Sequence, residues 1–179
     1  MPAERIISID CEANGLHGQV FAAAATLQHW RYGQIGAWGH RCPIGGTVDP
    51  WVAEHVLPGL DDELHGMQTT VDSYNDLCQE WRDFYDPLKK EGDWQVVCHV
   101  PWPVEARFLW DAHRDEPFSG PFPILDVAGM LDAAGNDPTS VDDYLRKLGL
   151  KPAGRAHHPL DDAINAATAY WYLSGRWRR

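Results

Sequence analysis

The sequence predicts an α/β fold built on a mixed sheet, and two observations carry that prediction. Three β-like runs near the N-terminus are separated only by short turns, which is typical of an antiparallel meander. Helical and strand-like segments then alternate to the end of the chain, which is typical of strands joined through helices. We therefore expect a mixed five-stranded sheet, with three strands in the meander and two further strands, flanked by helices.

The first half of the chain supplies the meander. Its strands are predicted at residues 5–12, 19–29 and 34–41. The alanines at 22–25 also suit a helix, but Val20, Thr26 and the short flanking turns favour a strand covered on both faces. Asp49 followed by Pro50 predicts an N-cap and the first residue of a short helix to about residue 56. Residues 57–70 carry few periodic signals and are expected to cross the surface.

The second half alternates between helices and strands. Apolar residues at helical spacing predict a helix over residues 73–89. A buried strand is expected at 94–100, a helix opened by proline at 103–113 and a strand at 123–127. Ser140 with Asp143 forms a capping pattern for a helix ending near Gly149, and residues 159–173 form the last helix.

Size and composition indicate one domain over residues 1–179. The chain is 44% hydrophobic, and no Pro/Gly/Ser-rich linker divides it. The N-terminus has no apolar leader and no apolar stretch is long enough to span a bilayer, so we expect a soluble, cytoplasmic protein with no membrane contact. The four cysteines form no C-x-x-C pair and are expected to be reduced.

A formal charge of −11 argues against a protein that binds nucleic acid through a broad basic surface. It does not exclude an enzyme that meets phosphate through metal ions, because carboxylates that hold divalent cations form a positively charged site.

Two carboxylates end the first predicted strand. Because side chains alternate along a strand, Asp10 and Glu12 point to one face, and Ile7, Ile9 and Cys11 point to the other. Two buried acids on one face either share a proton or hold a hard cation such as Mg²⁺ or Mn²⁺. Solvated acids at a strand end are the alternative, so this pair needs further evidence.

The last helix adds a third acid. Asp162 shares its helical face with apolar residues, whereas Asp161 shares its face with polar ones, so Asp162 is expected to point inward and Asp161 outward. The inward face carries Ala166, Ala169 and Leu173, and the outward face carries Asn165, Thr168 and Tyr172. Stabilisation of the helix N-terminus by negative charge is the alternative role for either aspartate.

The same argument places a fourth acid inward. Glu105 shares a face with Phe108, Leu109 and Ala112, although a first-turn Glu also suits the helix dipole. Four inward acids at element ends, Asp10, Glu12, Glu105 and Asp162, together indicate a metal site.

These residues resemble the DEDDh exonuclease family, which has a ribonuclease H-like fold. The stretch from Ile9 to Leu16 is similar to that family's strand-borne D-x-E followed by a turn ending in Gly-Leu. His157 to Ala163 matches the family spacing H-x-x-x-x-D-A. Glu105 followed by Phe108 and Leu109 resembles the second motif, except that the family has Asp where this chain has Glu, and Val100 stands near its usual Asn.

The resemblance implies a metal-dependent 3′-5′ exonuclease that hydrolyses phosphodiesters with two Mg²⁺ or Mn²⁺ ions. Asp10 would bridge both ions, Glu12 and Asp162 would complete the first, and Glu105 would hold the second, directly or through a water. His157 would accept the proton of the attacking water. Its neighbour His158 is the competing candidate, with an N-cap or surface role as its alternative.

The expected partner is the 3′ end of single-stranded DNA or RNA. The resemblance implies substrate contacts at Ala13, Asn14, Gly15, Leu16, His17, His99, Trp102 and Phe108. The alternative function is a catalytically reduced module that keeps the fold and binds nucleic acid or a protein. A metal-dependent phosphoesterase acting on small nucleotides is a weaker option. The nine tryptophans leave a homodimer open.

Overall fold

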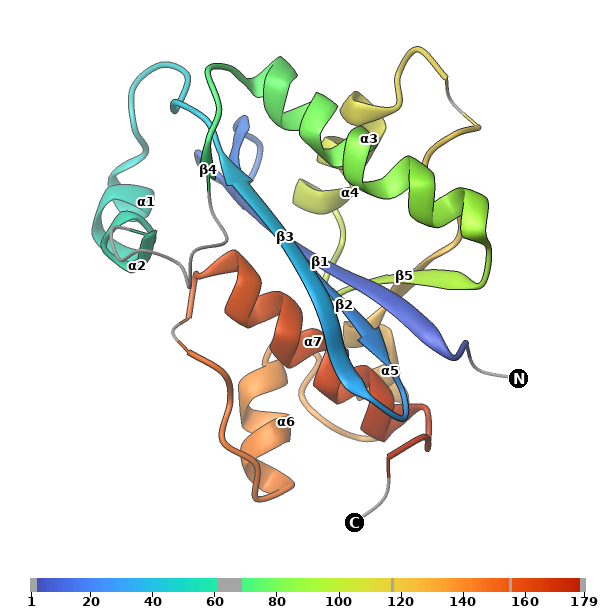
Figure 1. The fold of residues 1–179 in the computed structure, drawn as a ribbon. Helices are drawn as coiled ribbons and strands as arrows, with labels where there is room; N and C mark the ends of the chain where they lie inside the picture. The colour runs from blue at the N-terminus through green and yellow to red at the C-terminus, as the bar shows by residue number, and fades with distance from the viewer. Residues whose placement is uncertain (1–2, 61–68, 117, 155, 178–179) are drawn as a thin grey trace.

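The computed structural model describes residues 3–60, 69–116, 118–154 and 156–177 of the chain. A mixed sheet runs through its centre, with strand order β4-β3-β2-β1-β5-β6 (Figure 1). The meander consists of β1 (Arg5–Ala13), β2 (Val20–His29) and β3 (Gly33–Arg41). The remaining strands are β4 (Thr69–Thr70), β5 (Trp94–Cys98) and β6 (Ile124–Asp126).

The predicted five-strand arrangement is confirmed, and one short strand is added to it. β1 pairs with β2 and β2 with β3 in antiparallel fashion, while β5 pairs parallel to β1 and β6 parallel to β5. The added strand, β4, pairs two residues parallel to β3 at the edge of the sheet. The alanines of β2 are fully buried and pair with β1, where Asp10 lies opposite Ala24 and Glu12 opposite Ala22.

Helices cover both faces of this sheet. In Figure 1, α3 (Tyr74–Glu91) and α4 (Val104–Ala112) lie on one side of the strands. On the other side lie α5 (Val127–Ala133), α6 (Val141–Lys147) and α7 (Pro159–Leu173). Two short helices, α1 (Pro50–His55) and α2 (Leu57–Leu60), lie at the edge where β1 ends and α7 begins.

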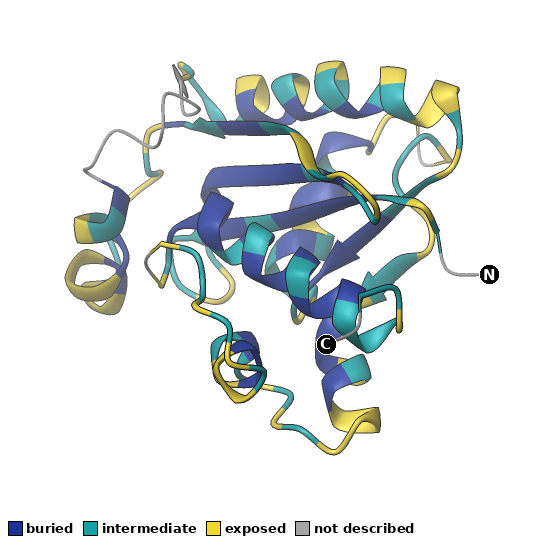
Figure 2. Ribbon diagram, turned by 60° about the horizontal axis from the view of Figure 1, so that its bottom comes forward, coloured by how far each residue is buried: buried dark blue, intermediate teal, exposed yellow. Residues whose placement is uncertain are grey.

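The sheet separates two hydrophobic clusters, and β1 contributes to both. Ile7, Ile9 and Cys11 pack with α3 and α4, whereas Ile6 packs with α5, α6 and α7. Figure 2 shows the resulting pattern, with buried strands between helices whose outer faces are exposed. Because side chains alternate along the strand, Asp10 and Glu12 fall on the same face as Ile6, which is the face that α7 covers.

Several element boundaries differ from the predictions. The expected strand at 94–100 ends at Cys98, and the expected strand at 123–127 ends at Asp126, whose side chain accepts a hydrogen bond from the Ala128 N–H and starts α5. That helix was not predicted. The segment 57–70 contains α2 and β4, and its residues 61–68 lie outside the described residues. No helix in the described ranges is long and apolar enough to cross a membrane.

Candidate active site

Three carboxylates from the two ends of the chain meet at the C-terminal end of β1. Oxygen atoms of Asp10, Glu12 and Asp162 all lie within 4.8 Å of one another. The strand brings the first two to one face, and the first turn of α7 brings the third, as the helical pattern predicted. An all-oxygen donor set of this kind suits a hard divalent cation such as Mg²⁺ or Mn²⁺.

The electrostatics of this carboxylate group are those of a site that lacks positive charge. Burial, and after it the carboxylates of Asp162 and Glu105, raises the pKa of Glu12 to about 8. Burial likewise raises the pKa of Asp162 to about 7, although the backbone N–H of His157 opposes the shift. The pKa of Asp10 is raised well above its ordinary value by burial, Glu105, Asp162 and Glu12, in that order. A cation between these oxygens would relieve both the burial cost and the repulsion.

Glu105 lies beside the three carboxylates and is not one of the group within 4.8 Å. Its side chain is buried, as predicted, and its Oε1 accepts a hydrogen bond of 3.1 Å from the Cys11 N–H, between the two acids of β1. Burial raises the pKa of Glu105 to about 8, while the backbone N–H groups of Glu105 and Cys11 lower it. Its position ties the first turn of α4 to the acidic end of β1.

His157 lies at the start of α7, with an unusual backbone conformation. Its φ is +63°, and its backbone N–H donates a hydrogen bond of 2.9 Å to Asp162 Oδ2. The half-buried ring meets Trp51 of α1 edge to face, with ring centroids 5.1 Å apart. Burial lowers the pKa of His157, and His55 lowers it further. A non-glycine residue at positive φ costs energy and is kept where the surrounding structure demands it.

His158 and Asp161 form a separate, buried pair. His158 is the N-cap of α7, its Nδ1 accepts a hydrogen bond from the Asp161 N–H, and Asp161 Oδ2 lies 3.2 Å from the same nitrogen. The prediction that Asp161 points outward is therefore wrong, because its side chain is buried.

Asp161 is buried because a loop covers this face of α7. A Cβ added at Gly154 would lie 1.7 Å from Asp161 Oδ2, and Asn165 holds the N–H and C=O of Ala153 through its side chain.

The turn after β1 is held in place by the side chain of Asn14. Its Nδ2 donates to the carbonyls of Gly45 and Thr47, at 3.3 and 2.9 Å, and its Oδ1 accepts from the Asp49 N–H at 2.7 Å. Gly15 has a φ of +79°, which a residue with a side chain rarely adopts. The turn containing Ala13, Asn14 and Gly15 thus has a fixed backbone, and it carries Leu16 out into solvent.

Three of the predicted substrate contacts line one groove beside this turn. Leu16, His17 and Trp102 contribute to a groove of about 400 Å³, together with Arg107 and Trp110 of α4. Arg107 also donates a hydrogen bond of 2.8 Å to the His17 carbonyl, which links the turn to α4. Arg107 was not predicted as a site residue; the available signal was its exposed position on α4, away from the buried face of Glu105.

His99 and Phe108 lie elsewhere. His99 Nε2 is 2.8 Å from the Pro138 carbonyl, on the loop that precedes α6. Phe108 is fully buried and packs against Trp81 and Tyr74 in the core, so it has no exposed face for a base. Phe108 lies three residues after Glu105 and anchors α4 in the core.

Val100, near the position where the family motif has Asn, has a φ of +54°. Asn tolerates this conformation better than a β-branched residue does, so Val100 is strained at this position. The Val100 N–H donates a hydrogen bond of 3.1 Å to Asp126 Oδ1, so the strained residue is held by the N-cap of α5.

Comparison with known proteins bears on the fold. Neither the protein-family models nor the curated proteins contain a match. Solved structures do match over nearly the whole chain. The nuclease domain of 3′hExo, a DEDDh family member bound to rAMP, superimposes with a TM-score of 0.69 at 18% identity, covering 99% of this chain and 96% of that one.

Two further structures show the same similarity. A structure of 3′-end specific recognition of a histone mRNA stem-loop by a 3′-exonuclease gives a TM-score of 0.71 at 16% identity, covering 98% of this chain and 83% of that one. The Mg²⁺- and Mn²⁺-bound form of Pop2p from S. pombe gives 0.70 at 13% identity, with 96% and 83% covered. The chain therefore has the ribonuclease H-like fold of the DEDDh exonucleases, as predicted.

Proposed function

We propose that this protein is a metal-dependent 3′-5′ exonuclease that removes nucleotides from single-stranded DNA or RNA. The observation that carries the proposal is the convergence of Asp10, Glu12 and Asp162 at one edge of this fold. The similar structures support a nuclease, because one is of a 3′-exonuclease that recognises the 3′ end of a histone mRNA stem-loop and another is bound to rAMP. Their sequence identities to this chain are only 16% and 18%, so the proposal rests on the carboxylates of the site rather than on sequence similarity.

The residues present fit a divalent metal site. Asp10, Glu12 and Asp162 would hold one ion, and Glu105 would serve a second from its position beside Asp10. Bound metal ions would polarise the phosphodiester, activate a water and neutralise the leaving oxygen. Glu105 is a Glu where the resemblance expects an Asp, and its bond to the Cys11 N–H lets it hold the D-x-E backbone in register.

The other residues of the site would position the substrate and move a proton. His157 would accept the proton of the attacking water, because its ring is partly exposed and its backbone N–H contacts Asp162, while His158 is buried as an N-cap. The turn from Ala13 to His17 would receive the terminal nucleotide, and Trp102 would offer a stacking face. His99 would contact the substrate only if the loop at Pro138 released its ring.

The test is a polarity assay on labelled strands. Single-stranded DNA and RNA carrying a 5′ label are incubated with Mg²⁺ or Mn²⁺, and we expect a ladder of products shortened one nucleotide at a time from the 3′ end. Chelation of the metal should stop it. Asp10→Asn should stop it as well, because the amide removes one metal ligand without changing the shape of the side chain.

Strands that stay intact with both metals, yet bind the protein in a mobility-shift measurement, would instead favour the alternative of a catalytically reduced binding module. This alternative is favoured by the position of Glu105, which lies outside the group of three carboxylates.

A further inference from the structure

The groove beside the site continues along α4 into a second, larger one. The first groove, about 400 Å³, begins at the turn that follows β1. The second, about 740 Å³, lies between the end of α3, the start of β5 and the segment 118–124. Ala106 and Trp110 line both, so the outer face of α4 connects them.

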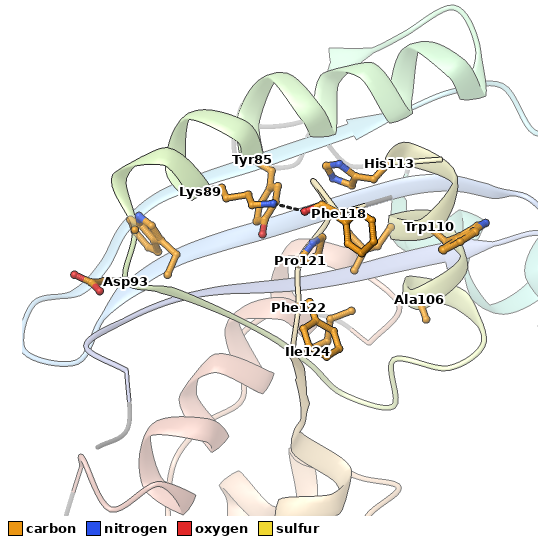
Figure 3. A pocket seen from close by; sticks show the side chains of 14 residues that line it. Tyr85, Lys89, Asp93, Ala106, Trp110, His113, Phe118, Pro121, Phe122 and Ile124 are labelled. Carbon is orange, nitrogen blue, oxygen red and sulfur yellow. Dashed lines mark hydrogen bonds between the residues drawn. The ribbon is translucent and has the colours of Figure 1, made fainter. Parts of the chain in front are cut away.

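This connecting surface exposes large aromatic side chains. Trp102, Ala106 and Trp110 recur every four residues, and the two tryptophans are 73% and 61% exposed. Phe118 and Phe122, on the far side of the larger groove, are 97% and 96% exposed (Figure 3). Exposed apolar side chains gathered along a groove on a folded domain are typical of a binding site.

The aromatic segment is held to the helices. Lys89 Nζ donates hydrogen bonds to the carbonyls of Phe118 and Ser119, at 2.8 and 2.6 Å, and His113 Nδ1 lies 2.8 Å from Ser119 Oγ. Figure 3 shows Lys89 reaching from α3 to this segment, opposite Trp110 on α4. The exposed rings therefore stand on a backbone that is fixed at its start, which lowers the entropy lost when a ligand binds.

The charges of the two grooves differ from those of the chain as a whole. Lys89 and Arg107 line them, and Asp93 is the one carboxylate among the described lining residues. In a chain of net charge −11, this balance makes the surface unusually compatible with phosphates. Aromatic faces with a few cations are the chemistry by which proteins bind single strands without reading their sequence.

We propose that this surface, from Trp102 along α4 to Phe122, is a track for the single-stranded chain that leads into the site. The proposal rests on the proposed function and adds a substrate class to it, namely strands long enough to pass the end of α4. That helix has nine residues, or about 14 Å at 1.5 Å per residue, which is the length of roughly four stacked nucleotides. The track predicts that strands of six or more nucleotides bind better than dinucleotides.

The test compares a dinucleotide with a 12-nucleotide strand in the wild type and in the double variant Phe118→Ala with Phe122→Ala. Both side chains are almost fully exposed, so the variant should fold. In the wild type we expect KM for the 12-mer to be at least tenfold below that for the dinucleotide, and in the variant we expect most of that ratio to be lost. Tyr32→Ala, at an exposed aromatic on the β2–β3 turn, is the matched control and should keep the ratio.

Fluorescence anisotropy of the labelled 12-mer in chelator separates this proposal from the proposed function. Tighter binding by the wild type than by the double variant supports the track even if no strand is cut. A dinucleotide that is cut with the same KM as the 12-mer overturns the track and leaves the exonuclease proposal in place. Light scattering that shows a dimer in the wild type and a monomer in the variant also overturns it, because a second copy would then cover this surface.

Discussion

Two neighbouring pairs at the start of α7 have the same residue types and different surroundings. His158 and Asp161 contact each other, are buried, and cap the helix beneath the loop at Gly154. His157 and Asp162, the residues that flank this pair, are linked by a hydrogen bond from the His157 backbone N–H, and the Asp162 carboxylate joins those of Asp10 and Glu12. The comparison shows that a buried acid or histidine with its own hydrogen-bonding partner supports the structure. A side chain surrounded by groups of the same charge has a shifted pKa and is available for chemistry.

The largest expected effect separates the two aspartates. Asp162→Asn should lower the exonuclease rate roughly 1,000-fold, because loss of a metal ligand removes several kcal/mol of transition-state stabilisation. The amide can still accept the His157 N–H, so the protein should stay folded. The rate of shortening of a labelled strand and the unfolding temperature in chelator measure the two effects.

Asp161→Asn is the matched control. Its activity should stay within about threefold of the wild type, while stability falls by about 1–3 kcal/mol because the amide does not reproduce the contacts of the buried Asp161 carboxylate. Equal losses of activity at the two positions would contradict the division into a structural pair and a chemical pair.

Asparagine substitutions also separate the two histidines. His157→Asn should lower the rate about 100- to 10,000-fold, the usual contribution of a general base. Asparagine tolerates the positive φ at this position, so the backbone is kept. His158→Asn places a good N-cap residue at the start of α7 and should change the rate only slightly. A larger loss at His158 than at His157 would reverse the assignment of the proton acceptor.

A smaller effect is expected at Glu105. Glu105→Gln should lower the rate about 10- to 100-fold, the range found for groups that orient metal ligands from outside the first coordination shell, since its Oε1 holds the Cys11 N–H. Glu116→Gln, an exposed residue after α4, is the control. The Mn²⁺ concentration that gives the half-maximal rate should be higher for Glu105→Gln than for the wild type, and unchanged for Glu116→Gln. If neither variant changes it, Glu105 does not belong to the metal site.

The carboxylates also make the stability of the metal-free protein depend on pH. The pKa values of Glu12 and Asp162 are raised to about 8 and about 7 in the folded protein, so the metal-free fold binds more protons than the unfolded chain. Its stability should be fully present below about pH 4, near the ordinary carboxylate range, and should fall as pH rises through about 8.

The unfolding temperature in chelator and in Mn²⁺, measured from pH 5 to pH 9, tests this expectation. Added Mn²⁺ should stabilise the protein most at the upper end, because metal binding displaces protons from the carboxylates. A metal effect that is the same at every pH would mean that these acids are already ionised without metal.

The sequence was sufficient to predict the direction of a side chain where the repeat of a strand or helix determines which face is buried. Alternation along β1 placed Asp10 and Glu12 on one face, and the alanines of α7 pointed Asp162 toward them. It was insufficient where a distant segment covers a surface. The loop at Ala153 and Gly154 buries the polar face of α7, so Asp161 became internal although its neighbours Asn165 and Thr168 read as a solvent face.

The same limit explains the missing details of the site. The contact of Trp51 with His157 joins α1 to the start of α7 across about a hundred residues of sequence. The hydrophobic pattern of neither segment predicts such a contact. The α5 helix begins directly at the end of β6, where Asp126 serves as N-cap. No loop separates the two elements, so the sequence has no turn residues there to indicate where the strand ends and the helix begins. The antiparallel pairing of the first three strands, by contrast, followed from the short turns between them.

Metal location is the most direct test of the account. Crystals soaked in Mn²⁺ and measured at an anomalous wavelength should show density bounded by Asp10, Glu12 and Asp162, and Asp162→Asn should weaken or remove it. Anomalous density at the buried His158 and Asp161 instead, or none at the carboxylates of β1 at millimolar Mn²⁺, would contradict the claim that these three acids form the catalytic centre.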